Sequence, residues 1–114
     1  IFRQMGLFEK TGIDIPGEAN SIMHNKKNVG AVELATMSFG QSFQITPLQL
    51  MRAASAAVNG GTLVTPHFGM KAVDSSGKTV KTFEFAKKKN VIKKETSETM
   101  RELLEAVRRF RKEL

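Results

Sequence analysis

Residues 46–61 read TPLQLMRAASAAVNGG, and this segment decides what the rest of the chain folds around. Thr46 is a favourable helix N-cap, Pro47 suits the first helical position, and Gln49 stands where a capping box needs it. Apolar residues then recur at helical spacing until Asn-Gly-Gly at 59–61, which predicts the end of the helix. The many small side chains indicate close neighbours on nearly all sides. We therefore expect a buried helix with the apolar positions Leu48, Leu50, Met51, Ala54, Ala57 and Val58.

The sequence after this helix predicts a hairpin and a second helix. Residues 62–65 favour a short strand that Pro66 stops. Residues 68–73 and 78–85 favour two hairpin arms around an Asp-Ser-Ser-Gly turn, with a bulge in the second arm. Residues 94 to about 112 have the periodicity of an amphipathic helix. Its apolar stripe consists of Met100, Leu103, Leu104, Val107, Phe110 and Leu114.

The sequence before residue 46 predicts less regular structure. Residues 1–5 favour the end of a helix with Gly6 as its left-handed stop. Residues 7–28 are rich in Gly and Asn and favour a long ordered loop, and residues 31–37 favour a short helical turn. The predicted class is therefore α+β, with an irregular N-terminal loop, a buried helix, a short β-hairpin and an amphipathic C-terminal helix.

Composition bounds the chain without assigning a function. At 114 residues with 40% apolar residues it forms one domain at most, or part of a larger one. The absence of cysteine excludes disulfides, thiolate metal sites and thiol catalysis. The net charge of +7 is uneven, because residues 61–114 carry thirteen Lys/Arg against seven Asp/Glu. A basic half of this kind suggests a polyanionic neighbour, or simply a solvated surface.

Two further segments carry a resemblance to a known family. Residues 9–18 read EKTGIDIPGE, and residues 35–41 read ATMSFGQ, followed by ITPLQL at 45–50. They resemble, in order and spacing, two stretches of the transpeptidase domain of class B penicillin-binding proteins. The likeness extends over roughly residues 1–107, and two ordered motifs are far more specific than a lone glycine pattern.

The chain departs from the family pattern in three places. Ser42 stands where a third small residue, usually Gly, follows Gly40-Gln41. Lys93 takes the usual helix-capping hydroxyl position before the last helix. After Val107, residues 108–112 do not resemble the glycine-rich turn of the family, which leaves the origin of the tail at 108–114 open.

The resemblance implies the penicillin-binding transpeptidase fold, which is similar to that of serine β-lactamases, and a serine acyltransferase that crosslinks peptidoglycan and is acylated by β-lactams. That chemistry uses a Ser nucleophile one helical turn before a Lys, a Ser-x-Asn box and a Lys-Thr-Gly strand. The letters at 75–78 fit Ser-x-x-Lys, but Gly77 interrupts any helix there. Lys-Thr-Gly at 10–12 belongs to the first motif, where Pro16-Gly17 would cut a strand short. No Ser-x-Asn is present.

We therefore expect residues 1–114 to be a partial transpeptidase domain, lying between the Ser-x-Asn box and the Lys-Thr-Gly strand. Without the nucleophilic Ser, its Lys partner and that strand, the chain alone should catalyse nothing, so we assign no catalytic residue. Its opening within amphipathic sequence, with no initiator Met, favours an internal segment of a longer protein. The expected partners are the rest of that domain and, through it, the peptidoglycan stem peptide and β-lactams.

One loop is a candidate for substrate contact. In the family the loop that matches Phe39, Gly40 and Gln41 runs close to the cleft. There Gln41 could hydrogen-bond a peptide backbone and Phe39 could form an apolar wall. The alternative is that Gly40 makes a turn, Phe39 plugs the core and Gln41 caps neighbouring backbone; both interpretations stay open. His24 and His67 have no carboxylate at ligand spacing, so we expect no metal, and no motif indicates a cofactor.

Location and assembly follow from the same interpretation. The resemblance implies a longer protein at the outer face of a bacterial plasma membrane, anchored by a segment that this chain lacks. The alternative is a small basic polyanion- or nucleic-acid-binding module, but no nucleic-acid motif is present, so we expect no nucleic-acid partner. For the chain alone we expect self-association, with the lysine tract at 87–90 as linker or hinge.

Overall fold

The helix that follows Thr46 forms as predicted. In the computed structural model, which describes residues 1–113, helix α2 spans Pro47–Val58. The Thr46 hydroxyl accepts a hydrogen bond from the Gln49 N–H at 3.1 Å, and the Gln49 side chain accepts one from the Thr46 N–H at 2.8 Å. This capping box satisfies donors that a helix start leaves unpaired. Gly60 ends the helix in a left-handed conformation, with φ 91°.

The other elements confirm an α+β chain with an irregular first third. Helix α1 spans Ala31–Ser38, and a 3-10 turn, η1, precedes it at Lys26–Asn28. Strands β2 (Lys71–Val73) and β3 (Thr79–Thr82) form the predicted antiparallel hairpin. Ala72 faces Lys81 whereas Val73 faces Thr79, so the second arm carries the extra residue, as expected. The last element is helix α3, at Lys94–Glu113.

The lysine tract at 87–90 is not the linker that the sequence suggests, and this part of the prediction is wrong. Lys87 and Lys88 form strand β4 and pair with strand β1, which comprises Leu63–Val64. Leu63 is fully buried, so the backbone of β1 needs hydrogen-bond partners on its open edge. Lysines can supply them because their long side chains still reach water.

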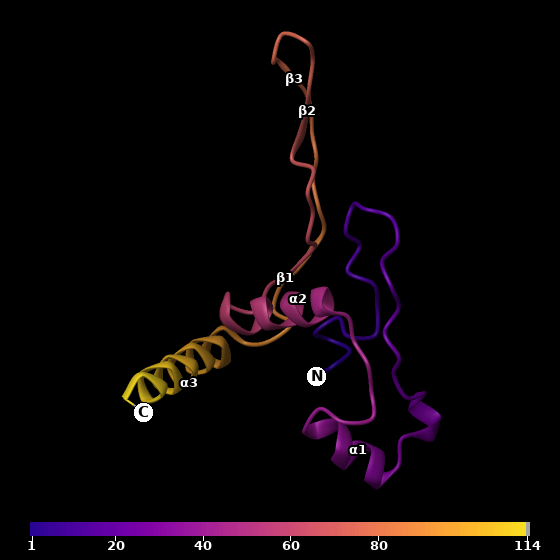
Figure 1. Ribbon diagram of the computed structural model, residues 1–114, viewed down its shortest axis with the longest axis vertical. Coiled ribbons are helices and arrows are strands. Elements are labelled where there is room, and N and C mark those ends of the chain that lie inside the picture. The colour runs from indigo at the N-terminus through magenta and orange to yellow at the C-terminus, as the bar shows by residue number, and fades with distance from the viewer. Residues whose placement is uncertain (114) are drawn as a thin grey trace.

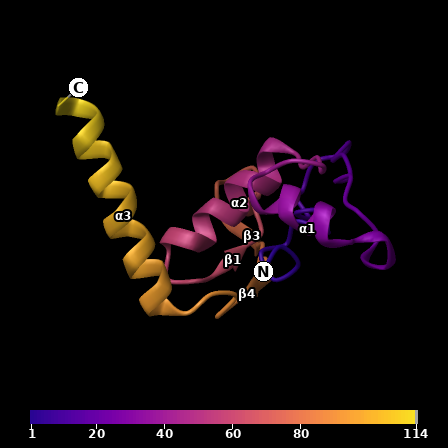
Figure 2. The same ribbon diagram turned by 90° about the horizontal axis from the view of Figure 1, so that it is seen from below.

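Figure 1 shows that the elements radiate from α2 and do not close around one core. The β2–β3 hairpin projects away from α2, α1 lies on the opposite side, and α3 leads off to the C-terminal end (Figures 1 and 2). The radius of gyration is 17.9 Å, against about 13 Å for a compact chain of similar length. The chain is therefore far more open than a self-contained domain.

Helix α2 packs through one face, against β1 and the start of α3. Its buried residues are Gln49, Arg52, Ala53 and Ala56, and the core adds Leu7, Met37 and Leu63. The opposite face is not covered within residues 1–113, since Leu50 and Met51 are 56% and 67% exposed. No element among residues 1–113 lies over that face.

Within residues 1–113, helix α3 is held only at its beginning. The Ser97 hydroxyl, fully buried, accepts a hydrogen bond from the Gly60 N–H at 2.9 Å. Further along, the predicted apolar stripe is exposed, with Val107 at 66% and Phe110 at 64%; Leu114 lies outside the described residues. The tail at 108–112 continues the helix. There, hydrogen bonds from Arg108 and Arg109 lower the pKa of Glu105 to about 2.

Substitutions at the N-cap and on the exposed face of α2 should change the free energy of unfolding by different amounts. Thr46→Ala should lower the free energy of unfolding by about 0.5–2 kcal/mol, because it removes the cap hydroxyl. Ala54→Leu, on the exposed face, should change it by less than about 0.5 kcal/mol in this chain. Urea unfolding followed by circular dichroism measures both variants. A large cost for Ala54→Leu would show that another surface covers this face.

Uncovered apolar faces on two helices predict self-association of the isolated chain. The faces comprise Leu50 and Met51 on α2 and, on α3, Met100, Leu103, Leu104, Val107 and Phe110. Burying such surface stabilises association in proportion to its area. Sedimentation velocity over a hundredfold concentration range should show dimers or larger species. A folded monomer at every concentration would contradict this expectation.

Candidate functional site

The segment after α1 closes the helix with main-chain hydrogen bonds, and the Ser38 hydroxyl adds a bond to the Ala35 carbonyl in the last turn. The Gln41 N–H donates to the Thr36 carbonyl at 3.0 Å, and the Gly40 N–H donates to the Met37 carbonyl at 3.2 Å. Together with φ 85° at Gly40, these bonds form a Schellman motif, in which glycine takes the left-handed position. Gly40 therefore makes a turn. The bonds do not use the side chains of Phe39 and Gln41.

The next residues are anchored on both sides. The Phe43 ring lies 5.4 Å from that of Phe2, and Gln44 exchanges two backbone hydrogen bonds with Ile22, both at 2.8 Å. Thr46 then begins α2. Between these anchors Ser42 adopts φ 65°, in the left-handed region that side-chain-bearing residues avoid. The α1–α2 connection is thus a fixed loop.

Within residues 39–42 the side chains of Phe39, Gln41 and Ser42 are exposed, and so is that of Gln44 further along the connection. Phe39 is 68% exposed, so within residues 1–113 it is not part of the core. A flat aromatic ring, a carboxamide and a hydroxyl on a rigid loop can recognise an amide-containing ligand by stacking and hydrogen bonding. We call residues 39–42 the presenting loop. Its contact with substrate stays a prediction.

The first motif, residues 9–18, is a loop closed by a carboxylate clasp. Glu18 Oε1 accepts hydrogen bonds from both the N–H and the hydroxyl of Thr11, each at 2.6 Å, and Oε2 accepts from the Gly12 N–H at 3.2 Å. Desolvation raises the pKa of Glu18, but these bonds outweigh it and lower the pKa. No strand forms at 10–12, in agreement with a structural role for this Lys-Thr-Gly.

The same motif is tied to α2 and to β4. The Gln49 side-chain amide donates to the Glu9 carbonyl at 2.8 Å, and Gln49 is only 1% exposed. The Glu9 carboxylate pairs with Lys88 at 2.7 Å and lies 3.9 Å from Arg52, whose Nε donates to Val64. The hydrogen bond from Lys88 is the main cause that lowers the pKa of Glu9. Glu9 thus joins the motif to two other elements.

Asp14 connects the motif to the projecting hairpin. Its carboxylate accepts hydrogen bonds from the consecutive N–H groups of Phe68 and Gly69, at 2.8 and 2.7 Å. These bonds lower the pKa of Asp14. Beside them His67 stacks on Phe85, with ring centroids 3.8 Å apart. The roles of Asp14, Glu18 and Gln49 as connectors could not be predicted from the sequence, because only the folded chain brings their partners close.

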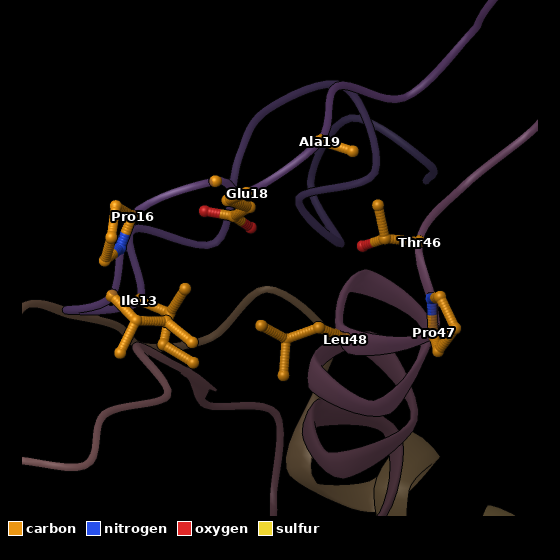
Figure 3. Close-up of a pocket in the computed structure, with 9 residues that line it drawn as sticks. Ile13, Pro16, Glu18, Ala19, Thr46, Pro47 and Leu48 are labelled. Carbon is orange, nitrogen blue, oxygen red and sulfur yellow. The ribbon is translucent and has the colours of Figure 1, made fainter.

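A hollow of about 290 Å³ lies between the first motif and the start of α2. Figure 3 shows Leu48 reaching towards Ile13 beneath the loop that carries Glu18. Its lining is apolar apart from Glu18 and Thr46, and both already have hydrogen-bond partners. This hollow offers packing surface and no reactive group.

The Ser-x-x-Lys letters at 75–78 lie in a turn, as expected. Asp74 Oδ1 accepts hydrogen bonds from the N–H groups of Ser76 and Lys78 and from the Ser76 hydroxyl. Gly77 has φ 83°, so Ser75 and Lys78 do not share a helix face. Among residues 1–113 no group of three His, Asp or Glu side chains is placed to hold a metal ion. No described helix has the length and apolar character needed to cross a bilayer.

Comparison with known proteins assigns this architecture to a class. The family described as penicillin binding protein transpeptidase domain matches residues 1–111, and the chain belongs to this family. The fold agrees with that of penicillin-binding protein 3 from Mycobacterium tuberculosis, with a TM-score of 0.76 and 24% identity over 86% of this chain and 22% of that one. Its complex with ampicillin gives a TM-score of 0.75, over 84% and 21%.

Among relatives, the chain is similar to stage V sporulation protein D of Bacillus subtilis (strain 168). The two are 46% identical over 106 residues, which are 92% of this chain and 16% of the relative. It is also 36% identical over 74 residues to the peptidoglycan D,D-transpeptidase MrdA of Acinetobacter baumannii, covering 57% of this chain and 11% of that protein. The chain thus spans a small part of the length of its relatives.

The Glu18 clasp predicts a loss of stability in acid. A carboxyl whose pKa is lower in the folded state than its ordinary 4.5 stabilises the fold above that value, and the contribution is lost as the pH falls through the folded pKa. Urea unfolding of the chain should therefore become easier between about pH 5 and 3. Glu18→Gln, which keeps an acceptor but cannot titrate there, should show a shallower dependence. Identical pH profiles would rule out the clasp as a contributor.

Proposed function

We propose that this chain forms one wall of the transpeptidase domain of a longer penicillin-binding protein, a D,D-transpeptidase that crosslinks peptidoglycan. The observation that carries the proposal is the family match over residues 1–111, together with relatives named as cell-wall transpeptidases. The ampicillin complex of a protein with the same fold supports β-lactam binding by the longer protein. Its catalytic Ser and Lys would come from outside this chain.

The segment belongs between the Ser-x-Asn box and the Lys-Thr-Gly strand of that domain. The order of the two motifs supports this placement, as does the open shape of the chain. The uncovered faces of α2 and α3 would then pack against the missing sheet and nucleophile helix, because apolar faces of this size are buried in complete domains. The rest of the transpeptidase domain is therefore the first partner that we propose.

The presenting loop would form part of the cleft edge. Phe39 would provide an apolar wall and Gln41 hydrogen bonds to an extended peptide, with Gly40 fixing the backbone between them. The main-chain closure of the loop supports this role, since it leaves both side chains available for a ligand. The proposed ligands are the peptidoglycan stem peptide and β-lactams that resemble it.

The proposed location is the outer face of a bacterial plasma membrane, with an anchor outside this chain, where peptidoglycan is assembled. The relative named as a peptidoglycan D,D-transpeptidase supports this location. The polyanion-binding alternative is disfavoured by the family match.

Reaction with a fluorescent penicillin tests the function. The isolated chain should form no covalent adduct, because an activated Ser needs its base within hydrogen-bond reach. The longer protein should give a one-to-one adduct by intact mass spectrometry, lost when its nucleophilic Ser is replaced by Ala. An adduct on Ser75 of the isolated chain, or none on the longer protein, would contradict the proposal.

A further inference from the structure

Ser42 holds a backbone conformation that its side chain disfavours. Among residues 1–113 only two residues other than glycine have positive φ, Ser42 at 65° and Asn90 at 56°. Asn often adopts this region because its short amide bonds locally, whereas Ser does so less readily. Such strain persists where the surrounding structure imposes it, and it is concentrated at functional sites.

The surroundings of Ser42 impose this conformation from both sides. On one side the Schellman motif fixes Gly40 and Gln41, and on the other Phe43 and Gln44 are held by Phe2 and Ile22. These anchors involve the backbone of the connection and the Phe43 ring, and none of them uses the Ser42 hydroxyl. A glycine would fit this position without strain, so the folding of the loop does not account for a serine there.

We propose that Ser42 is a specificity-determining residue of the cleft edge, whose hydroxyl hydrogen-bonds a peptide amide of the bound substrate. Ser42 follows Gln41 directly, and both are exposed on the presenting loop. A hydroxyl can donate and accept, as can the Gln41 carboxamide, so the pair matches the alternating N–H and C=O groups of an extended peptide. In a penicillin the corresponding group is the side-chain amide. This inference rests on the proposed function and adds a ligand contact to it.

The test compares Ser42→Ala and Ser42→Gly in the longer protein. Both lack the hydroxyl, but they differ in strain, since glycine relieves it and alanine retains it. The matched control is Asn90→Gly, which relieves the other left-handed residue, located after β4 and outside the presenting loop. Two probes are used, benzylpenicillin, which carries the side-chain amide, and 6-aminopenicillanic acid, which lacks it.

Both Ser42 variants should react with benzylpenicillin about two- to tenfold more slowly than the wild type, the effect of losing one hydrogen bond. Their rates with 6-aminopenicillanic acid should be unchanged, as should both rates of Asn90→Gly. Melting temperatures should separate the two variants, with Ser42→Gly at or above the wild type and Ser42→Ala at or below it. Unchanged rates with benzylpenicillin, or equal slowing with both penicillins, would overturn the role of the hydroxyl. A wild-type protein inert to both penicillins would instead overturn the proposed function itself.

Discussion

The buried amide of Gln49 is the interaction on which the other contacts depend. Its oxygen completes the capping box of α2, and its nitrogen donates to the Glu9 carbonyl forty residues earlier. One side chain therefore starts the central helix and fixes the first motif against it. Gln49 is only 1% exposed, and its removal would take the hydrogen-bond partner from both the Thr46 N–H and the Glu9 carbonyl, so the two contacts depend on one side chain. β1, α3 and the presenting loop are then placed by α2.

Because the contacts of the chain converge on the single helix α2, its segments have fixed positions although the chain as a whole is not compact. Polar clasps of Asp14, Glu18 and Ser97 fix where segments meet, but they bury little apolar surface. The small side chains of α2 allow close packing on two faces, and the chain fills one of them. The sequence therefore encodes more contacts than its own elements can make, which is the physical signature of a segment shaped for a larger domain.

Local signals predicted the helices, the hairpin and its bulge, because caps, turns and periodicity act over a few residues. They failed where partners are distant in sequence. The sequence of Lys87-Lys88 does not show that these residues pair with the strand of the buried Leu63. The sequence around Glu18 likewise does not show that its carboxylate accepts hydrogen bonds from Thr11. For the site, Gly40 as a turn was predictable from its neighbours. The strain at Ser42 was not, because it arises from anchors at Phe2 and Ile22 that the sequence does not reveal.

The polar residues of the two motifs divide into those that the fold uses and those that it leaves free. Four polar residues of these motifs are of types that often serve in catalysis or binding: Glu9, Asp14, Glu18 and Gln49. In the folded chain each of them hydrogen-bonds the backbone or another side chain. Their lowered pKa values, where present, follow from those bonds and indicate no acid–base role. The presenting loop differs from these residues. Main-chain hydrogen bonds hold it in place, and its polar side chains make no hydrogen bonds within residues 1–113. A ligand contact is best sought there, because recognition needs fixed groups whose hydrogen bonds are not already made.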